Sequence, residues 1–429
     1  MSTQGSVDQT DGGSSTGHAA GEHGQNDPEY VDAVFGGLEP DGSNQNRGPR
    51  TTFAPWHHPV KQIVRDYQWA DQVRRLLRDH RTEDGRGTLR YFTLPGADLF
   101  DVRVLADALS ASKTRIEYFG FDVGYDGAGV NESREDVKSI YLETESALRQ
   151  SGQITDRAEI LADRLEDIAQ DGSHASNRLR QREVFDVVNI DACDHLGFVP
   201  KGRSKSIFDA LETLLAHQLR AANPWLLFIT TRAKPDLLGL PATKLQSAIF
   251  KNLEQHSEAF GQALASCIGG KVQTIAADLN GHWSTQSRSF LKLFCIGLGK
   301  YLLQYYHAQQ NLPATVELVS AFNYKVSSDE PDMLSLAFRI NPNGIKVQPG
   351  SAGGAAVIPA LELKYAVGVV EKADKLWDLD EAVAANDVVK QDAVAGTERL
   401  LALADYDIQR WKVWLASLPV RPMQLDDAA

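Results

Sequence analysis

Residues 88–122 read TLRYFTLPGADLFDVRVLADALSASKTRIEYFGFD, and they carry the clearest indication of the fold class. Apolar and aromatic residues over 88–94 predict a strand, a proline–glycine turn follows, and residues 99–109 carry apolar side chains at helical spacing. A second apolar run over residues 115–122 predicts another strand. A strand, a tight turn, a helix and a second strand form a βαβ unit, so the two strands are expected to be parallel.

The same alternation of strands and helices continues to about residue 340. Further strands of the parallel sheet are expected over residues 152–155, 184–190 and 225–231, and the predicted helices include residues 132–150, 156–169, 207–219 and 243–266. Two more strands, residues 315–324 and 333–340, are joined by a short polar turn, which predicts an antiparallel hairpin. The expected fold class is therefore α/β, with a Rossmann-like, mostly parallel sheet and a C-terminal antiparallel hairpin.

Composition changes on both sides of this α/β region. Residues 1–50 are rich in small and polar residues and predict a disordered tail, because they cannot bury enough apolar surface to offset their ordering entropy. Residues 51–87 contain an amphipathic helix. Residues 341–358 are rich in Gly, Pro and Ala and predict a flexible linker, and residues 359–429 predict a helical region. The sequence thus predicts a Rossmann-like domain over residues 88–340 with N- and C-terminal helical appendages.

The predicted N-terminal helix carries the most basic stretch of an acidic chain. Its polar face holds Lys61, Arg65, Arg74, Arg75 and Arg78. A solvated face is the ordinary interpretation of this pattern, and a face for nucleic acid or for a substrate phosphate is the alternative.

The 429-residue chain has a formal net charge of −13 at pH 7, which disfavours a general nucleic-acid coat or a binder of anionic membranes. No apolar run is long enough to span a bilayer, and the first residues lack the features of a secretion signal. Cys193, Cys267 and Cys295 are widely spaced and lie among apolar residues, so buried free thiols are expected rather than a metal site. These observations predict a cytoplasmic protein.

Polar residues gather where the predicted strands end, and open parallel sheets bind ligands at the carboxyl ends of their strands. The first strand ends in Leu94-Pro95-Gly96, where a glycine lets a ligand approach the backbone and the next helix offers its N–H groups. The second strand ends in Asp122, a carboxylate that can accept both hydroxyls of a ribose. The fourth strand ends in the polar run NIDACDH, residues 189–195.

This series of strand, glycine turn, helix, acid-tipped strand and FDVVNID resembles the class I S-adenosylmethionine-dependent methyltransferases. In its overall sequence pattern it is most similar to the three-Cys-motif partner proteins, a bacterial group. The resemblance covers residues 88–340, and the final hairpin is similar to the last two strands of that fold, where an antiparallel strand inserts into the sheet. The chain departs from the family in one respect: the cofactor loop usually has two or three glycines, and here Gly96 is alone and follows a proline.

The resemblance implies S-adenosylmethionine as the cofactor. It matches Leu94, Pro95 and Gly96 to the cofactor loop, and Asp122 to the acid that binds the ribose. It further matches Asp156 to the acidic position after the third strand, near the adenine.

The resemblance also matches Asp191 to the residue that faces the methyl-transfer site, where it would contact the cofactor as well as the methyl acceptor. Asp191, Asp194 and His195 would orient the methyl acceptor, with His195 or Asp191 as the base. Purely structural interpretations also exist: Gly96 as a turn glycine, and Asp122 and Asp191 as helix caps.

The expected function is methyl transfer to an unidentified acceptor, which is a small molecule, a nucleic acid or a protein. The run NIDACDH has no proline and no aromatic residue with which to hold a flipped base, and this disfavours methylation of a base amino group. The second hypothesis is a catalytically degenerate, methyltransferase-like scaffold that binds a protein partner. The resemblance places such a scaffold in a bacterial multi-gene system, for example one of anti-phage defence.

Two other motifs are expected to be structural. Gly297-Leu298-Gly299-Lys300 is similar to the end of a phosphate-binding loop, but it lacks the first glycine and the Ser or Thr after the lysine. It also lies inside an apolar run, so its glycines are expected to serve helix packing. His57 and His58 have no acidic partners at metal-ligand spacing.

Overall fold

The computed structural model describes residues 48–80, 87–123, 134–237, 239–309, 314–326, 329–342 and 359–418. The chain divides into two units, Met1–Pro49 and Arg50–Ala429. The predicted tail over residues 1–50 and the predicted linker over residues 341–358 fall almost entirely outside the described residues, and the predicted domain boundaries stay predictions.

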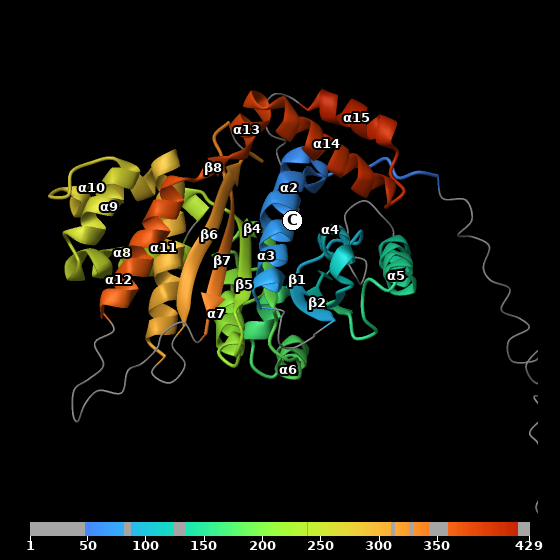
Figure 1. Ribbon diagram of the computed structural model, residues 1–429, viewed down its shortest axis with the longest axis horizontal. Coiled ribbons are helices and arrows are strands. Elements are labelled where there is room, and N and C mark those ends of the chain that lie inside the picture. The colour runs from blue at the N-terminus through green and yellow to red at the C-terminus, as the bar shows by residue number, and fades with distance from the viewer. Residues whose placement is uncertain are drawn as a thin grey trace, which may run out of the picture. The chain divides into compact units, whose positions relative to one another are not determined.

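A mixed sheet with the strand order β3-β2-β1-β4-β5-β7-β6-β8 forms the centre of the second unit (Figure 1). In chain order the strands are β1 (Thr88–Thr93), β2 (Arg115–Phe121), β3 (Glu159–Leu161), β4 (Val187–His195), β5 (Trp225–Arg232), β6 (Thr315–Tyr324), β7 (Met333–Asn341) and β8 (Trp377–Asp378). Strands β1 to β5 pair in parallel, and β7 is antiparallel to both of its neighbours. The predicted α/β class is confirmed, and β7 inserts between β5 and β6 as the resemblance implied.

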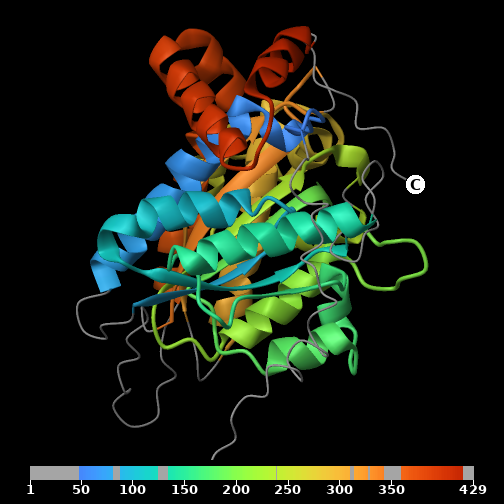
Figure 2. The same ribbon diagram turned by 90° about the vertical axis from the view of Figure 1, so that its right-hand side faces the viewer.

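Helices cover both faces of this sheet (Figures 1 and 2). One face packs against α2 (Pro59–Ile63), α3 (Asp71–His80), α4 (Phe100–Leu109), α5 (Arg134–Gln150), α13 (Leu379–Ala385), α14 (Asp387–Ala402) and α15 (Ile408–Ser417). The other packs against α6 (His174–Arg180), α7 (Ile207–Gln218), α8 (Gly239–Gln255), α9 (Ala259–Ile268), α10 (Ile275–Ser284), α11 (Arg288–His307) and α12 (Pro359–Asp374). Each face of the sheet forms a hydrophobic cluster with the helices that cover it. In strand β5, Leu226 and Phe228 belong to the cluster on the first face, whereas Leu227 and Ile229 belong to the cluster on the second, because side chains alternate along a strand.

The predicted N-terminal helix is present as α2 and α3, joined by a π-helical segment over Val64–Ala70. Segments of π-helix are rare and often occur at functional sites. This one contacts the middle of the sheet: Trp69 stacks on Phe228 with ring centroids 6.4 Å apart, and Gln68 donates a hydrogen bond to the Ser320 hydroxyl at 2.8 Å. The N-terminal appendage is therefore part of the core packing of the α/β fold.

The predicted third strand is wrong. Residues 152–155 make only an isolated bridge, Ile116 to Ile154, and the true β3 lies at Glu159–Leu161, inside the stretch predicted as a helix. The remainder of that stretch contains a short 3₁₀ helix, Leu165–Ala169. Pairing with β2 decides the outcome, because tertiary context overrides a local helical pattern in so short a segment.

Three other boundaries also differ from the prediction. Strand β4 does not end at residue 190 but continues to His195 beside β5, with an irregular register between Asp191 and His195. The predicted C-terminal helices break at β8 and again between α14 and α15, where Asp405 has a φ of 56°. The predicted helix over residues 243–266 is split into α8 and α9.

Candidate functional site

The strand order reverses between β1 and β4, and the candidate residues Gly96, Asp122 and Asp191 lie at this part of the carboxyl edge of the sheet. The register pairs Thr93 of β1 with Gly120 of β2, so the turn after β1 and the end of β2 are neighbours. Such a reversal is where open α/β sheets bind ligands. The structure thus brings three of the matched positions to one edge, while their roles remain proposals.

The turn after β1 is closed by a hydrogen bond from the Leu99 amide to the Gly96 carbonyl at 2.9 Å. Leu94 is half-buried, Pro95 is buried and Gly96 is exposed. A Cβ added to Gly96 would meet no atom within 4 Å, so the space beside this glycine is open. Gly120 is the glycine that packing requires, because a Cβ there would lie 2.9 Å from Cδ of Pro95.

Asp122 follows β2 directly and is partly exposed. Its backbone N–H donates to the Leu161 carbonyl at 3.0 Å, and its carboxylate accepts a hydrogen bond from the hydroxyl of Tyr141 on α5. The same hydroxyl lies 2.9 Å from the Pro95 carbonyl oxygen. Burial and the neighbouring Asp122 raise the pKa of Tyr141 far above its usual value, so the phenol stays protonated.

The match of Asp156 to the acid after the third strand is wrong, because β3 starts three residues later, at Glu159. Asp156 precedes the strand and therefore lies at its amino end, whereas Asp122 lies at the carboxyl end of the parallel β2. The acid that follows β3 is Asp163, which hydrogen-bonds His174 Nδ1 at 2.7 Å. Correct placement of the strand in the sequence ILADR would have identified Asp163.

Asp191 forms an ion pair with Lys61 of α2, with Nζ 2.5 Å from Oδ1. The Lys61 side chain is only 8% exposed and that of Asp191 is 26% exposed, so the amine is buried and the carboxylate is not. Burial lowers the pKa of Lys61, and Asp191 opposes this shift. The amine also lies 4.9 Å from the ring centroid of Trp69.

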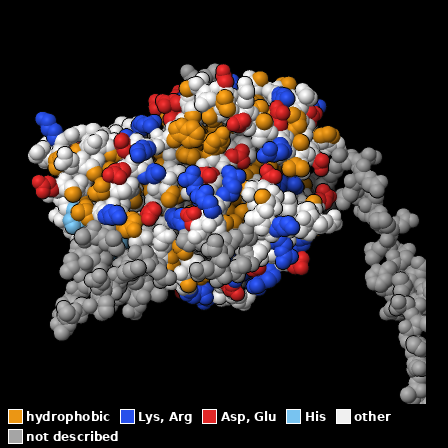
Figure 3. All heavy atoms as spheres, viewed as in Figure 1, with side chains coloured by type: hydrophobic (Ala, Val, Ile, Leu, Met, Phe, Trp, Pro, Cys, Tyr) orange, Lys and Arg blue, Asp and Glu red, His pale blue; other side chains and the backbone are white. Residues whose placement is uncertain are grey.

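This pair corrects the prediction that the whole polar face of the N-terminal helix is solvated. Lys61 and Arg65 are buried, and Arg65 donates to the Trp56 carbonyl at 3.0 Å. Arg74, Arg75 and Arg78 are exposed on α3, where blue side chains gather near the centre of Figure 3. Arg75 pairs with Asp71 at 2.9 Å, and Arg78 lies 3.5 Å from Asp79, so part of this charge is compensated locally.

Cys193 lies beyond Asp191 in β4, and the prediction that its thiol is buried is wrong: the side chain is exposed, whereas Cys267 and Cys295 are buried. Desolvation by the surrounding protein nevertheless raises the pKa of the Cys193 thiol to about 11.

His195 and Asp194 end β4, with His195 Nε2 3.8 Å from Asp194 Oδ1. Desolvation lowers the pKa of His195, so the ring is neutral at pH 7. Its Nδ1 is buried and has no hydrogen-bond partner among the described residues. A neutral imidazole with an unpartnered nitrogen can accept a proton.

A buried polar network beneath the turn after β1 was not predicted. Asp101, in the first turn of α4, accepts hydrogen bonds from Tyr91 at 2.8 Å and from the Thr93 hydroxyl, and the Asn189 amide donates to Tyr91 at 2.8 Å. The network joins β1, β4 and α4 directly below the candidate site. Asp101 was the sequence feature that could have indicated this network, because a buried Asp needs hydrogen-bond partners.

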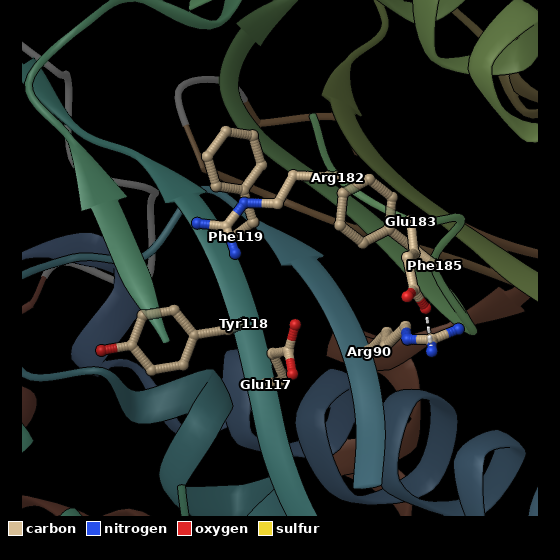
Figure 4. Close-up of a pocket in the computed structure, with 7 residues that line it drawn as sticks. All are labelled: Arg90, Glu117, Tyr118, Phe119, Arg182, Glu183 and Phe185. Carbon is tan, nitrogen blue, oxygen red and sulfur yellow. Dashed lines mark ion pairs between the residues drawn. The ribbon is translucent and has the colours of Figure 1, made fainter. Parts of the chain in front are cut away.

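A shallow pocket lies at the opposite, amino edge of the sheet (Figure 4). Its lining includes Arg90, Glu117, Arg182 and Glu183. Arg90 pairs with Glu183, and Arg182 lies over the Phe119 ring at 4.6 Å, so these cations already have partners inside the protein. This pocket is separate from the candidate site.

Among the described residues, no group of three or more His, Cys, Asp or Glu side chains is arranged to hold a metal ion. His57 is buried and accepts a hydrogen bond from the Ala54 amide through Nδ1 at 3.0 Å. No helix within the described ranges is long and apolar enough to cross a membrane.

A family model described as PP_RS20740-like matches residues 50–416. The chain belongs to this family. No curated protein matches it. The matched range includes α2 and α14 as well as the sheet, so the helical appendages are part of what defines the family.

Two solved structures are similar to this member of the family. One is described as a caffeoyl-CoA O-methyltransferase from Staphylococcus aureus, with 11% identity over 73% of this chain and 98% of that chain and a TM-score of 0.26. The other is a type I restriction-modification methyltransferase subunit from Streptococcus thermophilus, with 11% identity over 89% of this chain and 62% of that chain and a TM-score of 0.29. At these scores, neither structure carries an argument about activity.

Proposed function

We propose that this protein is an S-adenosylmethionine-dependent methyltransferase whose cofactor lies across the carboxyl ends of β1, β2 and β4. The proposal rests on one observation. Asp122 and the open turn at Gly96 lie at the same edge of the sheet, at the point where the strand order reverses. An adenosine-containing ligand needs a backbone that it can approach closely and an acceptor for its ribose hydroxyls, and this edge offers both.

In this proposal the chain holds the cofactor and the cofactor supplies an electrophilic methyl group. Leu94, Pro95 and Gly96 line its approach to the N-terminus of α4, and Asp122 accepts the ribose hydroxyls. Asp163 takes the place of Asp156 as the acid nearest the adenine, because it follows β3 at the same edge as Asp122.

The acceptor lies on the β4 side, beside the exposed side chain of Cys193. Lys61 fixes one oxygen of Asp191 and compensates its charge, so Asp191 serves to orient the acceptor rather than to remove its proton. His195 is the better base, because its ring is neutral. Asp194 stabilises the imidazolium that forms.

The degenerate scaffold is the second candidate. It is favoured by one observation: the carboxylates of Asp122 and Asp191 are already engaged by Tyr141 and Lys61 of the same chain. In this case the edge is a closed structural network, and the function is binding of a protein partner by the helical appendages.

Titration calorimetry with S-adenosylmethionine and S-adenosylhomocysteine separates the two candidates. The methyltransferase proposal expects wild type and Asp156→Ala to bind both compounds equally well. It expects Asp122→Ala to lose at least about tenfold in affinity, the value of one charged hydrogen bond. Absence of binding by wild type rejects the methyltransferase and leaves the scaffold. Equal binding by Asp122→Ala rejects the assigned ribose site.

A further inference from the structure

Two tyrosine–carboxylate pairs join β2 to α5 in opposite directions. Tyr118 of β2 donates to Glu145 of α5, and Tyr141 of α5 donates to Asp122 at the end of β2. Both tyrosine side chains are completely buried. Glu145 is buried as well, whereas Asp122 is partly exposed at the candidate site. The two pairs are chemically alike, but only one of them ends at a surface that a ligand can reach.

Tyr141 also joins Asp122 to the turn after β1, because its hydroxyl lies 2.9 Å from the Pro95 carbonyl oxygen. Pro95 in turn rests against Gly120, which has no side chain to displace it. One hydroxyl, whose single proton is shared by two acceptors, therefore lies between the turn that precedes α4 and the carboxylate that follows β2. These are the two elements between which the proposed cofactor lies.

The hydrogen bond from Tyr141 has a directional effect on Asp122. The phenol stays protonated, so it always presents a donor to the carboxylate, and a charge-assisted hydrogen bond of this kind is stronger than a neutral one. Because Oδ2 accepts this bond, rotation of the carboxylate is restricted. A carboxylate held in this way is pre-organised to accept two adjacent ligand hydroxyls without first losing side-chain freedom.

We infer that Tyr141 is a positioning residue that orients Asp122 for the vicinal hydroxyls of a ribose, and that it makes the site select ribonucleosides over deoxyribonucleosides. The inference rests on the proposed function. Tyr141 touches the carboxylate and the turn but is itself buried behind them, so it acts through Asp122.

The test compares the affinities of S-adenosylhomocysteine and its 2′-deoxy analogue by calorimetry. Wild type should prefer the ribose form, and Tyr141→Phe should reduce this preference about tenfold, as expected for loss of a hydrogen bond to a charged group. Tyr118→Phe is the matched control: it removes an equally buried tyrosine–carboxylate bond between the same two elements and should leave the preference unchanged. A loss of preference common to both variants would mean a structural role for Tyr141 and overturn the inference.

Asp122→Asn provides a second route if Tyr141→Phe does not fold. This variant keeps the shape of the side chain but removes its charge, so it should also lose the ribose preference, and adding Tyr141→Phe to it should have no further effect on the ratio. Binding by wild type without any ribose preference overturns the inference about Tyr141 but leaves the proposed cofactor binding in place. Absence of binding by wild type instead rejects the proposed function itself.

Discussion

At the scale of single residues, the ion pair between Lys61 and Asp191 is the contact that ties the N-terminal helix to the candidate site. Lys61→Met leaves a partly buried carboxylate without its partner and should lower the free energy of unfolding by about 1–3 kcal/mol. Loss of a partner in a fully buried pair costs about 3–5 kcal/mol, and the 26% exposure of Asp191 reduces this. Urea denaturation measures the effect.

A matched control for Lys61 exists on the surface. Lys244 and Glu212 are also 2.5 Å apart, but their side chains are 37% and 31% exposed, so Lys244→Met should change stability by less than about 1 kcal/mol. Equal effects of the two substitutions would contradict the view that burial makes the Lys61 pair important.

A second prediction concerns His57 and the pH dependence of folding stability. Burial lowers its pKa to about 3 in the folded protein, whereas an unfolded histidine titrates near 6.5. Between these values the unfolded chain binds the proton and the folded chain does not, so stability is lost as the pH falls from about 6.5 towards 3, at up to about 1.4 kcal/mol per pH unit. His57→Gln should have a shallower loss of stability between pH 6 and pH 4, measured by denaturant unfolding, than the exposed-site control His174→Gln. Parallel curves would exclude His57 as the cause.

At the scale of elements, the close packing of α11 against its neighbours depends on two glycines. A Cβ on Gly299 would lie 2.6 Å from Cγ1 of Val369 on α12, and a Cβ on Gly297 would lie 2.9 Å from Cβ of Leu245 on α8. This confirms the prediction that these glycines serve helix packing rather than phosphate binding.

Gly299→Ala should therefore destabilise the protein by about 1–3 kcal/mol, the usual cost of overpacking a core. Gly368→Ala, on the facing helix α12, is the control: its added Cβ meets nothing within 4 Å, and alanine favours a helix by about 0.5–1 kcal/mol. Thermal melting of the two variants should give shifts of opposite sign. A stabilised Gly299→Ala would show that α11 and α12 can separate at little cost.

Elements with long apolar runs could be predicted from the sequence, and elements decided by pairing could not. Strands β1, β2 and β5 follow from their buried aromatic and aliphatic residues, and Asp122 follows from its place at the end of β2. Strand β3 has only three residues, so its position depends on β2, and with it the choice between Asp156 and Asp163. The burial of Lys61 could not be predicted either, because the sequence of a basic helix face does not show that it will pair with a carboxylate as distant in the chain as Asp191.

At the scale of the whole unit, the beginning and the end of the described chain meet. The Arg50 amide donates to the Asp405 carbonyl at 2.8 Å, and the Asp407 amide donates to the Arg50 carbonyl at 2.9 Å. Trp411 of α15 is completely buried and donates to the His57 carbonyl at 3.1 Å. The two helical appendages thus share one hydrophobic cluster with the sheet.

Trp411→Ala should lower the stability of the entire unit by about 3–5 kcal/mol, because a large buried side chain and its hydrogen bond are both lost. Calorimetry should show the main transition moving to lower temperature. The control Val413→Ala, on the same helix and 70% exposed, should change stability by less than about 0.5 kcal/mol. A separate early transition in Trp411→Ala would show instead that the appendages unfold on their own.

The π-helical segment that contacts the sheet has a consequence for the order of events during synthesis. Gln68 donates to the Ser335 carbonyl, and 267 positions separate the two residues. At about 5–20 residues per second, the ribosome needs roughly 13–53 s to reach the second after making the first. Ribosome-bound chains arrested before β7 should therefore expose the apolar side of the segment, including Trp69, to protease, and released full-length chains should protect it. This segment is made early, but it is among the last parts of the described chain to be packed.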